Sequence, residues 1–340
     1  MKISRSLIAT ALLASGLLSQ GVQAADTLPS FKIDAAETSV SGLSSGAFMA
    51  VQLQVAYSAS IKGAGVVAGG PYYCAAGNMM YAGICMGQMT FLPPNPALMV
   101  SAAKGFAKVG QIDALSNLKK RHIYVFSGTK DSVVYQPAVD ATVSFFKQVG
   151  VPEANLAYVN KVPAGHAVIT PSYGNSCDAN EAPYISHCEI DGQGYDQAGA
   201  LLKHIYGDLQ PKANALAGRL VTFDQRKFAA PITGMADEAF LYVPKACDAG
   251  ETCKVHVAIH GCVQSAESVG KQFIADTGYN EWAENNHLLV LYPQVNKSQV
   301  PFNPQGCWDW FGYTGANYAA KSGLQMMAIK SMITALAAKK

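Results

Sequence analysis

The pentapeptide G-L-S-S-G at residues 42–46, close to the N-terminus, constrains the fold more than any other feature of the sequence. Residues 38–41 before it are typical of a short strand, and residues 47–59 after it carry apolar side chains at helical spacing. A G-x-S-x-G segment between a strand and a helix indicates a sharp turn that lifts the middle serine above a sheet, where small neighbours relieve the crowding. We therefore expect Ser44 at the apex of a strand–turn–helix unit.

The first 24 residues have the pattern of a signal peptide. Lys2 and Arg5 precede an apolar run at residues 7–18, and V-Q-A at residues 22–24 supplies a small-x-small cleavage signal. An uncleaved membrane anchor is the alternative, but the apolar run is too short to cross a bilayer. We expect a secreted protein, extracellular or periplasmic, whose mature chain begins near Ala25 and has no membrane span.

The composition of the chain favours one large catalytic domain over residues 25–340 rather than two domains. Hydrophobic residues make up 50% of the sequence, whereas charged residues make up 14% and the formal net charge is +2. This weak charge excludes electrostatic recruitment of nucleic acid or of an anionic membrane, and it suits a neutral substrate. We expect a monomer.

Eight cysteines in an exported chain favour disulfides over a metal site. The sequence has no C-x-x-C motif, and its seven histidines form no zinc-ligand pattern, because His256 and His260 lie in a strand-like run where ordinary packing is the simpler explanation. We expect neither a metal nor a cofactor. Eight cysteines allow about 105 pairings, so their connectivity stays open here. Three pairs lie close in sequence, Cys74 with Cys85, Cys177 with Cys188, and Cys247 with Cys253, which leaves Cys262 and Cys307.

Strand-like and helix-like segments alternate along the chain. This alternation predicts an α/β fold with a parallel or mixed sheet that helices cover on both faces. The irregular segment at residues 211–236 is expected to be a crossover. Strands are expected at residues 38–41, 63–68, 121–127, 157–162, 239–243, 255–259 and 288–291, and helices at residues 47–59, 96–109, 137–149, 195–206, 269–285 and 315–338.

Two further polar residues follow expected strands in the order that a serine hydrolase requires. Asp131 lies in a turn after the strand at 121–127, and His166 lies in a loop after the strand at 157–162. The carboxyl ends of parallel strands meet at one edge of a sheet, so both side chains can converge on Ser44. A serine nucleophile needs a histidine base and an acid that orients the base. We expect Ser44, His166 and Asp131 to fill these roles.

The turn H-G-C at residues 260–262 follows the strand at 255–259 and resembles the oxyanion turn of esterases. Its backbone N–H groups, together with that of Ser45, would stabilise a tetrahedral intermediate. In the usual α/β-hydrolase this turn precedes the nucleophile, whereas here it comes long after Ser44. We therefore expect a circularly permuted α/β-hydrolase with a mostly parallel central sheet.

Four motifs resemble the single-domain, circularly permuted polyhydroxybutyrate depolymerases, which are secreted serine esterases: S-G-L-S-S-G at residues 41–46, A-G-G-P-Y at 68–72, A-I-H-G-C-V-Q-S at 258–265 and G-C-W-D-W at 306–310. The resemblance implies hydrolysis of poly(3-hydroxybutyrate) and related polyhydroxyalkanoates through an acyl-enzyme intermediate. It also implies an oxyanion hole made by the amides of Ser45 and Cys262, a Trp310 side chain beside the scissile ester, and a disulfide from Cys262 to Cys307.

Many polyester depolymerases carry a separate polymer-adsorbing domain, which we do not expect in this chain. Adsorption to solid polymer would then use the surface of the catalytic domain, with Tyr72, Tyr73, Phe91 and Phe302 as candidate aromatics. Aromatic residues more often pack in the core or within loops. Two alternative functions remain at this point. One is a related esterase for plant-wall feruloyl or acetyl esters or for other polyesters, and the other is a catalytically inactive binding protein.

Overall fold

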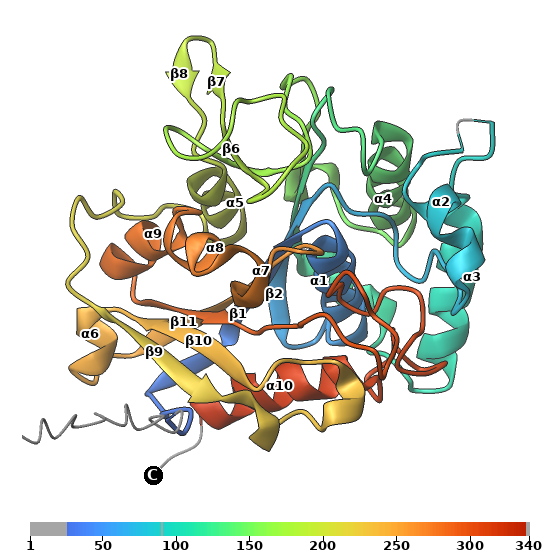
Figure 1. Cartoon of the computed structure of the whole chain (residues 1–340). Helices are drawn as coiled ribbons and strands as arrows, with labels where there is room; N and C mark the ends of the chain where they lie inside the picture. The colour runs from blue at the N-terminus through green and yellow to red at the C-terminus, as the bar shows by residue number, and fades with distance from the viewer. Residues whose placement is uncertain (1–25, 90, 338–340) are drawn as a thin grey trace, which may run out of the picture.

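The computed structural model describes residues 26–89 and 91–337, so the expected signal peptide at residues 1–24 lies outside the described residues. Within the described residues, an eight-stranded sheet forms the centre of the molecule and helices cover both of its faces (Figure 1). Neighbouring strands from β4 to β12 run parallel, and β10 and β9 extend the sheet in antiparallel fashion. The predicted α/β class with a mostly parallel sheet is confirmed.

The strands of the sheet lie in the spatial order β4 (Leu156–Val159), β3 (His122–Phe126), β2 (Ile61–Val67), β1 (Ile33–Leu43), β11 (Cys253–Ile259), β12 (Leu288–Tyr292), β10 (Glu238–Val243) and β9 (Arg219–Asp224). Two small ladders lie outside the sheet, β5 (Val168–Thr170) with β6 (Ile185–His187) and β7 (Glu189–Ile190) with β8 (Gln193–Gly194). The α-helices are α1 (Ser45–Ala56), α2 (Ala82–Cys85), α3 (Pro96–Lys108), α4 (Gln136–Gln148), α5 (Gln197–Tyr206), α6 (Lys245–Asp248), α7 (Ala266–Val269), α8 (Gln272–Ala275), α9 (Tyr279–Asn285) and α10 (Leu324–Leu336).

The chain enters this sheet in its middle. Strand β1 pairs on one side with β2 and on the other with β11, which follows far later in the sequence. In the ladder with β11, Gly42 lies beside Ile259, so the two strands end at the same edge of the sheet. The segments that follow them, residues 44–46 and 260–262, are therefore neighbours. This strand order is the circular permutation that the position of the H-G-C turn predicts.

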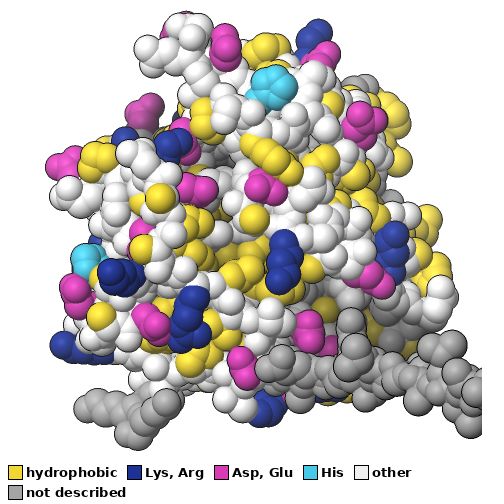
Figure 2. All heavy atoms as spheres, turned by 60° about the vertical axis from the view of Figure 1, so that its left-hand side comes forward, with side chains coloured by type: hydrophobic (Ala, Val, Ile, Leu, Met, Phe, Trp, Pro, Cys, Tyr) yellow, Lys and Arg dark blue, Asp and Glu magenta, His cyan; other side chains and the backbone are white. Residues whose placement is uncertain are grey.

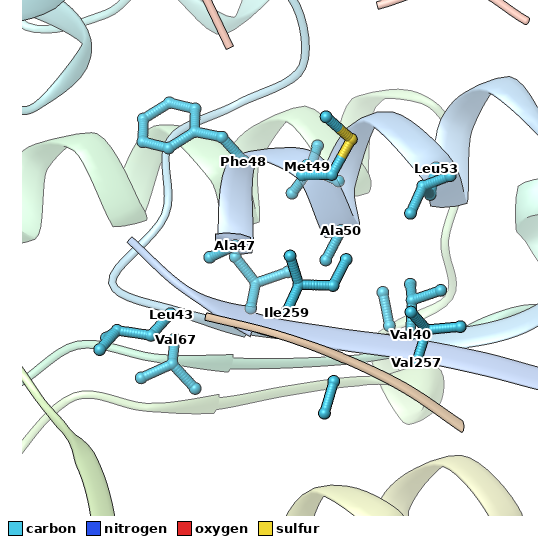
Figure 3. Packing of buried hydrophobic residues seen from close by; sticks show 14 of the residues in the cluster. Val40, Leu43, Ala47, Phe48, Met49, Ala50, Leu53, Val67, Val257 and Ile259 are labelled. Atoms are coloured by element: carbon cyan, nitrogen blue, oxygen red, sulfur yellow. The ribbon is translucent and has the colours of Figure 1, made fainter. Parts of the chain in front are cut away.

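The helix after the G-x-S-x-G turn lies inside the protein. Every residue of α1 is buried, which explains why the helix has no polar face. Figure 3 shows α1 above β1 and its neighbours, with Val40, Ala50 and Ile259 among the side chains of this layer. Because the nucleophile turn joins a buried strand to a buried helix, the core holds Ser44 from both sides.

Three sequence expectations about secondary structure are wrong. The segment at 211–236 contains the edge strand β9, and the helix expected at 269–285 is replaced by two short helices, α8 and α9, after α7 ends at Val269. Gly270 and Gly278 have φ of 61° and 87°, which a continuous helix does not allow. The terminal helix begins at Leu324 instead of residue 315, because residues 315–323 form successive turns, in which the N–H groups of Tyr318 and Ala320 donate to carbonyls three residues earlier.

Four disulfides link the cysteines, Cys74 to Cys85, Cys177 to Cys188, Cys247 to Cys253 and Cys262 to Cys307.

Among residues 26–89 and 91–337, no helix is long and apolar enough to cross a membrane. The same part of the chain contains no group of three or more His, Cys, Asp or Glu side chains that could hold a metal ion.

Candidate active site

The backbone at Ser44 adopts the strained conformation of a sharp strand-to-helix turn. Its φ of 56° and ψ of −123° lie outside the regions that residues with a Cβ normally occupy. The Ser44 N–H donates to the Val67 carbonyl of β2 over 3.0 Å, and the N–H groups of Ala47 and Phe48 donate to the Ser44 carbonyl. The sheet and the first turn of α1 thus hold the residue in this conformation.

The two glycines of the motif are required by close backbone contacts. A Cβ at Gly42 would overlap the carbonyl group of Gly46, and a Cβ at Gly46 would overlap the carbonyl of Ile259 at the end of β11. Substitution of either glycine would therefore force β1, α1 and β11 apart. The motif has glycine at both positions because the backbones of β1, α1 and β11 come into direct contact there.

Asp131 and His166 form a buried pair at the same edge of the sheet. The His166 Nδ1 atom lies 2.8 Å from Asp131 Oδ2, and the two side chains are only 4% and 1% exposed. The second carboxylate oxygen of Asp131 accepts hydrogen bonds from the N–H groups of Val133 and Val134, each over 2.9 Å. The carboxylate is thus fixed in its turn, and the Nε2 atom of His166 remains available for a second partner.

Asn180 connects the loops that carry Asp131 and His166, a role that the sequence analysis missed. Its Oδ1 atom accepts from the backbone N–H of His166 and from that of Ser132, both over 2.9 Å. Its Nδ2 group donates to the Lys130 carbonyl over 3.1 Å. The amide therefore fixes the spacing of the two loops, although no sequence motif marks the residue.

The H-G-C turn lies directly against Ser44. A Cβ added to Gly261 would lie 3.4 Å from the Cβ of Ser44. The Gly261 N–H donates to the Oε1 atom of Gln264 over 2.7 Å, so it is not free to bind an oxyanion. In contrast, the backbone N–H groups of Ser45 and Cys262 donate a hydrogen bond to no other residue in the described part of the chain.

Two buried side chains, His260 and Gln264, hold the oxyanion turn. The Nε2 atom of His260 accepts from the Val295 N–H over 3.1 Å, which leaves Nδ1 to carry the proton and donate to the Gly261 carbonyl over 2.7 Å. Burial lowers the pKa of His260 to about 4, so the ring is neutral. Gln264 donates to the carbonyls of Pro183 and Tyr184, and thereby ties the turn to the wall beside His166.

A cavity of about 300 Å³ brings the expected site residues together. Ser44, Ser45, His166, Cys262 and Trp310 all line it. No Asp, Glu, Lys or Arg side chain is among its described lining residues. The space therefore suits an uncharged, largely apolar ligand.

The Trp310 ring forms an aromatic wall of this cavity. It stacks on Phe48 of α1 with ring centroids 4.4 Å apart, and the ring of Phe311 meets its edge. The Cys262–Cys307 disulfide joins the Trp310 loop to the oxyanion turn. Within the loop, the buried carboxylate of Asp309 accepts from the N–H groups of Gly312 and Thr314. Burial raises the pKa of Asp309, and these hydrogen bonds oppose the rise.

A serine at a strained strand-to-helix turn and a buried His–Asp pair, placed around one cavity at the edge of a mostly parallel sheet, define a serine hydrolase of the α/β-hydrolase type. The chain is 47% identical over 320 residues to a poly(3-hydroxybutyrate) depolymerase of Delftia acidovorans, covering 92% of this chain and 62% of the Delftia protein. It is 40% identical over 329 residues to a polyhydroxybutyrate depolymerase of Talaromyces funiculosus, covering 91% of this chain and 92% of that protein. The chain belongs to the polyhydroxybutyrate depolymerase family.

Solved structures of the same family have the same fold. A structure of a PHB depolymerase with a serine-to-alanine substitution, complexed with an R3HB trimer, matches with a TM-score of 0.84 and 37% identity over 92% of this chain and 98% of that chain. The crystal structure of PHB depolymerase from Penicillium funiculosum matches with a TM-score of 0.83, the same identity and the same coverage. No family model matches the chain.

Proposed function

We propose that this protein is an exported serine esterase that hydrolyses ester bonds of poly(3-hydroxybutyrate) and related polyhydroxyalkanoates. The observation that carries the proposal is the buried His166–Asp131 pair, whose histidine lines one uncharged cavity with Ser44 in a chain of this family. The chain spans less than two thirds of the Delftia relative's length, 62%, so the activity of that whole protein enters here as part of the proposal.

In the proposed mechanism, the Ser44 Oγ attacks the ester carbonyl carbon and His166 Nε2 takes the hydroxyl proton. The new C–O bond pushes the carbonyl electrons onto oxygen, and the resulting oxyanion accepts hydrogen bonds from the N–H groups of Ser45 and Cys262. Both N–H groups are free of protein partners in the described residues, which supports this assignment. Asp131 keeps the His166 proton on Nδ1 and stabilises the imidazolium that forms.

Collapse of the tetrahedral intermediate breaks the ester C–O bond. His166 gives its proton to the departing alkoxide, which leaves as the hydroxyl end of one polymer fragment. A water molecule then attacks the acyl–Ser44 ester while His166 accepts its proton. The bond between the acyl carbon and Ser44 Oγ breaks, His166 returns the proton to Oγ, and the second fragment leaves with a free carboxyl group. Trp310 bounds the space beside the scissile ester in this proposal, and no metal or cofactor takes part in these steps.

Export and a single catalytic domain over residues 25–340 belong to the same proposal. The signal-peptide pattern at residues 1–24 and the four disulfides support an oxidising compartment outside the cytoplasm. We infer a monomer from the sequence alone.

Two substrates test the proposed function. The parent protein is expected to clear a poly(3-hydroxybutyrate) suspension and to hydrolyse p-nitrophenyl butyrate, and Ser44→Ala is expected to lose both activities by several orders of magnitude while it stays folded. Ser45→Ala is the matched control, because it keeps the backbone N–H and should retain much of the activity. Hydrolysis of the soluble ester without any clearing of the polymer would overturn the substrate assignment.

A further inference from the structure

A buried histidine that the proposed mechanism does not use lies in the sheet beneath the active site. His256 belongs to β11, the strand that leads into the oxyanion turn, and its side chain is 0% exposed. Burial lowers its pKa to about 3, so the ring is neutral and carries a single N–H group. Both ring nitrogen atoms nevertheless face polar side chains of β1, the strand that ends directly before Ser44.

The His256 ring bridges two serines of β1. Its Nδ1 atom lies 2.7 Å from Ser39 Oγ, and its Nε2 atom lies 2.8 Å from Ser41 Oγ. Ser39 Oγ also lies 2.7 Å from the hydroxyl of Tyr206 on α5. Ser41 Oγ lies 2.7 Å from the hydroxyl of Tyr279 on α9. These side chains form one continuous series of hydrogen bonds, which we call the His256 network.

The number of available protons gives the His256 network a direction. The Tyr206 hydroxyl lies 3.0 Å from the Glu37 carbonyl, which can only accept, so Tyr206 is the donor there. Ser39 then donates to Tyr206, and His256 donates to Ser39 from Nδ1. Its Nε2 atom has no proton and accepts from the Ser41 hydroxyl. With this order, every donor of the network has an acceptor.

The opposite order would leave a buried donor without an acceptor. In that order Nε2 of His256 would donate to Ser41, and Ser41 would donate to Tyr279. The Tyr279 hydroxyl has no other hydrogen-bond partner in the described part of the chain. Because an unpaired buried donor is costly, the network has one favoured arrangement, and each of its side chains is fixed in it.

The His256 network lies on the face of the sheet opposite α1. Figure 3 shows Val40 in the layer between β1 and α1, so its neighbours Ser39 and Ser41 point to the other face. Helix α9 lies at the left of Figure 1, and Figure 2 brings that side forward, where acidic and basic side chains are interspersed with neutral ones. Among the described residues, no charged side chain is hydrogen-bonded to the network. Neutral hydrogen bonds hold it together, and ion pairs do not.

The network lies where the pairing of β1 becomes regular. The ladder of β1 with β11 has an irregularity that ends at Thr38, and the ladder with β2 has one between Thr38 and Ser39. From Ser39 to Gly42 both ladders are continuous, and Ser39 pairs directly with His256. The network therefore joins β1 to β11 at the start of the segment that runs into Ser44.

The strained backbone at Ser44 explains why this connection matters. A turn with φ of 56° relaxes if a segment at either of its ends moves. The core fixes α1 at one end, because every residue of that helix is buried. At the other end, sliding of β1 along β11 would shift Ser44 Oγ relative to the Cys262 N–H. The His256 ring opposes this sliding, since it is bonded to two alternate residues of β1 at once.

We propose that His256 is a positioning residue for the reaction, which fixes the strand of Ser44 against the strand of the oxyanion turn. It acts through Ser39 and Ser41 and does not line the active-site cavity. Oxyanion stabilisation requires donors at defined distances, so the network supports the transition state more than the binding of substrate. This inference rests on the proposed function, because it takes Ser44 as the nucleophile and the Cys262 N–H as an oxyanion donor.

The test removes the connection without leaving a buried donor unpaired. The variant Ser41→Ala/His256→Phe/Tyr279→Phe deletes the central hydrogen bonds, whereas the hydroxyls of Ser39 and Tyr206 keep their acceptors. Replacement of such a complete set by apolar groups of similar shape is nearly neutral for stability. A purely structural role therefore predicts an unchanged enzyme, and a positioning role predicts a slower one.

Three measurements separate these roles. For the triple variant we expect kcat for p-nitrophenyl butyrate to fall about tenfold and KM to stay within about twofold of the parent. The Kd of a boronic-acid transition-state analogue should rise about tenfold, because the analogue also needs the aligned N–H groups. Chemical denaturation of both proteins shows that the triple variant is folded under the assay conditions.

Tyr292→Phe is the matched control. Tyr292 is a buried tyrosine of β12, and its hydroxyl donates to Asn280 Oδ1 over 2.8 Å. The change removes a buried hydroxyl from the strand next to β11 without altering the His256 network. Its kcat, its KM and its Kd for the analogue should all stay within about twofold of the parent.

Two further variants keep the test decisive. If the triple variant were unstable, Ser41→Ala/Tyr279→Phe would serve, because it leaves His256 bonded to Ser39 and every remaining donor paired. We expect its kcat to fall about threefold at an unchanged KM. His256→Gln places an amide oxygen where Nε2 accepts from Ser41, so it should retain more of kcat than the triple variant does.

The position of the His256 proton is a second, independent readout. Nitrogen-15 NMR of the neutral ring should show the proton on Nδ1. A proton on Nε2 would overturn the inference, because the network would then run in the other direction.

A folded triple variant whose kcat and analogue affinity match those of the parent would also overturn the inference, and so would an equal loss in Tyr292→Phe. Failure of the proposed function looks different. The parent would then hydrolyse the soluble ester without clearing the polymer, while the triple variant would still lose kcat on the soluble ester.

Discussion

The substitution Asp131→Asn tests the proposed triad at its most buried point. One carboxylate oxygen accepts from two backbone N–H groups, of Val133 and Val134, and the other faces His166 Nδ1 at 2.8 Å. An asparagine must keep its Oδ1 on the two N–H donors, which turns its NH₂ group toward His166. The histidine can then accept only if its proton moves to Nε2, where it blocks the removal of the Ser44 proton.

The expected effect is a loss in kcat of about 10⁴-fold, which corresponds to roughly 5 kcal/mol of transition-state stabilisation. KM for p-nitrophenyl butyrate should change little, because Asp131 does not line the substrate cavity. The matched control is Asp178→Asn, an exposed acid in the loop after His166, which should keep kcat within about twofold. A kcat of Asp131→Asn within tenfold of the parent, in a folded protein, would show that another group orients the histidine.

Three further predictions concern the oxyanion turn and the buried histidines. Cys307→Ser should lower kcat about 10²-fold, because it loosens the Cys262 amide. Cys247→Ser breaks the disulfide in α6 and should lower Tm but leave kcat within about twofold of the parent. Equal kcat values for the two variants would contradict a catalytic role for the Cys262–Cys307 disulfide. Gln264→Ala should lower kcat about tenfold with little change in KM, and should weaken binding of a boronic-acid transition-state analogue by a similar factor. Unchanged binding of the analogue would count against the role of Gln264 in positioning the oxyanion turn. Burial lowers the pKa of His256 and His260 to about 3 and about 4, below the ~6.5 of an unfolded chain. The unfolded state therefore binds more protons than the folded state below pH ~6.5. As the pH falls from ~6.5 to about 4, the free energy of unfolding should fall by about 1.4 kcal/mol per pH unit for each ring. Chemical denaturation at several pH values measures this slope, and a free energy of unfolding that does not change over this range would refute the prediction.

The sequence predicted those parts of the site that depend on local order along the chain. Five consecutive residues predict the tight turn at Ser44, because that turn requires small neighbours. Asp131 and His166 each follow a strand that the pattern of apolar residues predicts. The edge of a parallel sheet then brings such positions together without further information. The fold class and the permuted strand order follow from the same local signals.

The contacts that the sequence analysis missed join segments far apart in the chain. Asn180 bonds to the backbone of His166 and Ser132, and Gln264 reaches the carbonyls of Pro183 and Tyr184, so neither role has a local pattern. The helix expected at 269–285 is interrupted for another reason. Its apolar spacing continues through Gly270 and Gly278, but the positive φ of these two glycines is incompatible with a continuous helix. Periodicity alone does not report a positive φ.

Covalent trapping of the nucleophile tests the central claim most directly. The parent protein is quenched in acid during turnover of p-nitrophenyl butyrate, or is treated with an alkyl phosphonate ester, and the modified peptide is identified by mass spectrometry. We predict one adduct, on Ser44, that is absent from Ser44→Ala and retained in Ser45→Ala. An adduct on Ser45 or on any other residue, or active turnover of soluble ester by Ser44→Ala, would contradict the assignment of the nucleophile.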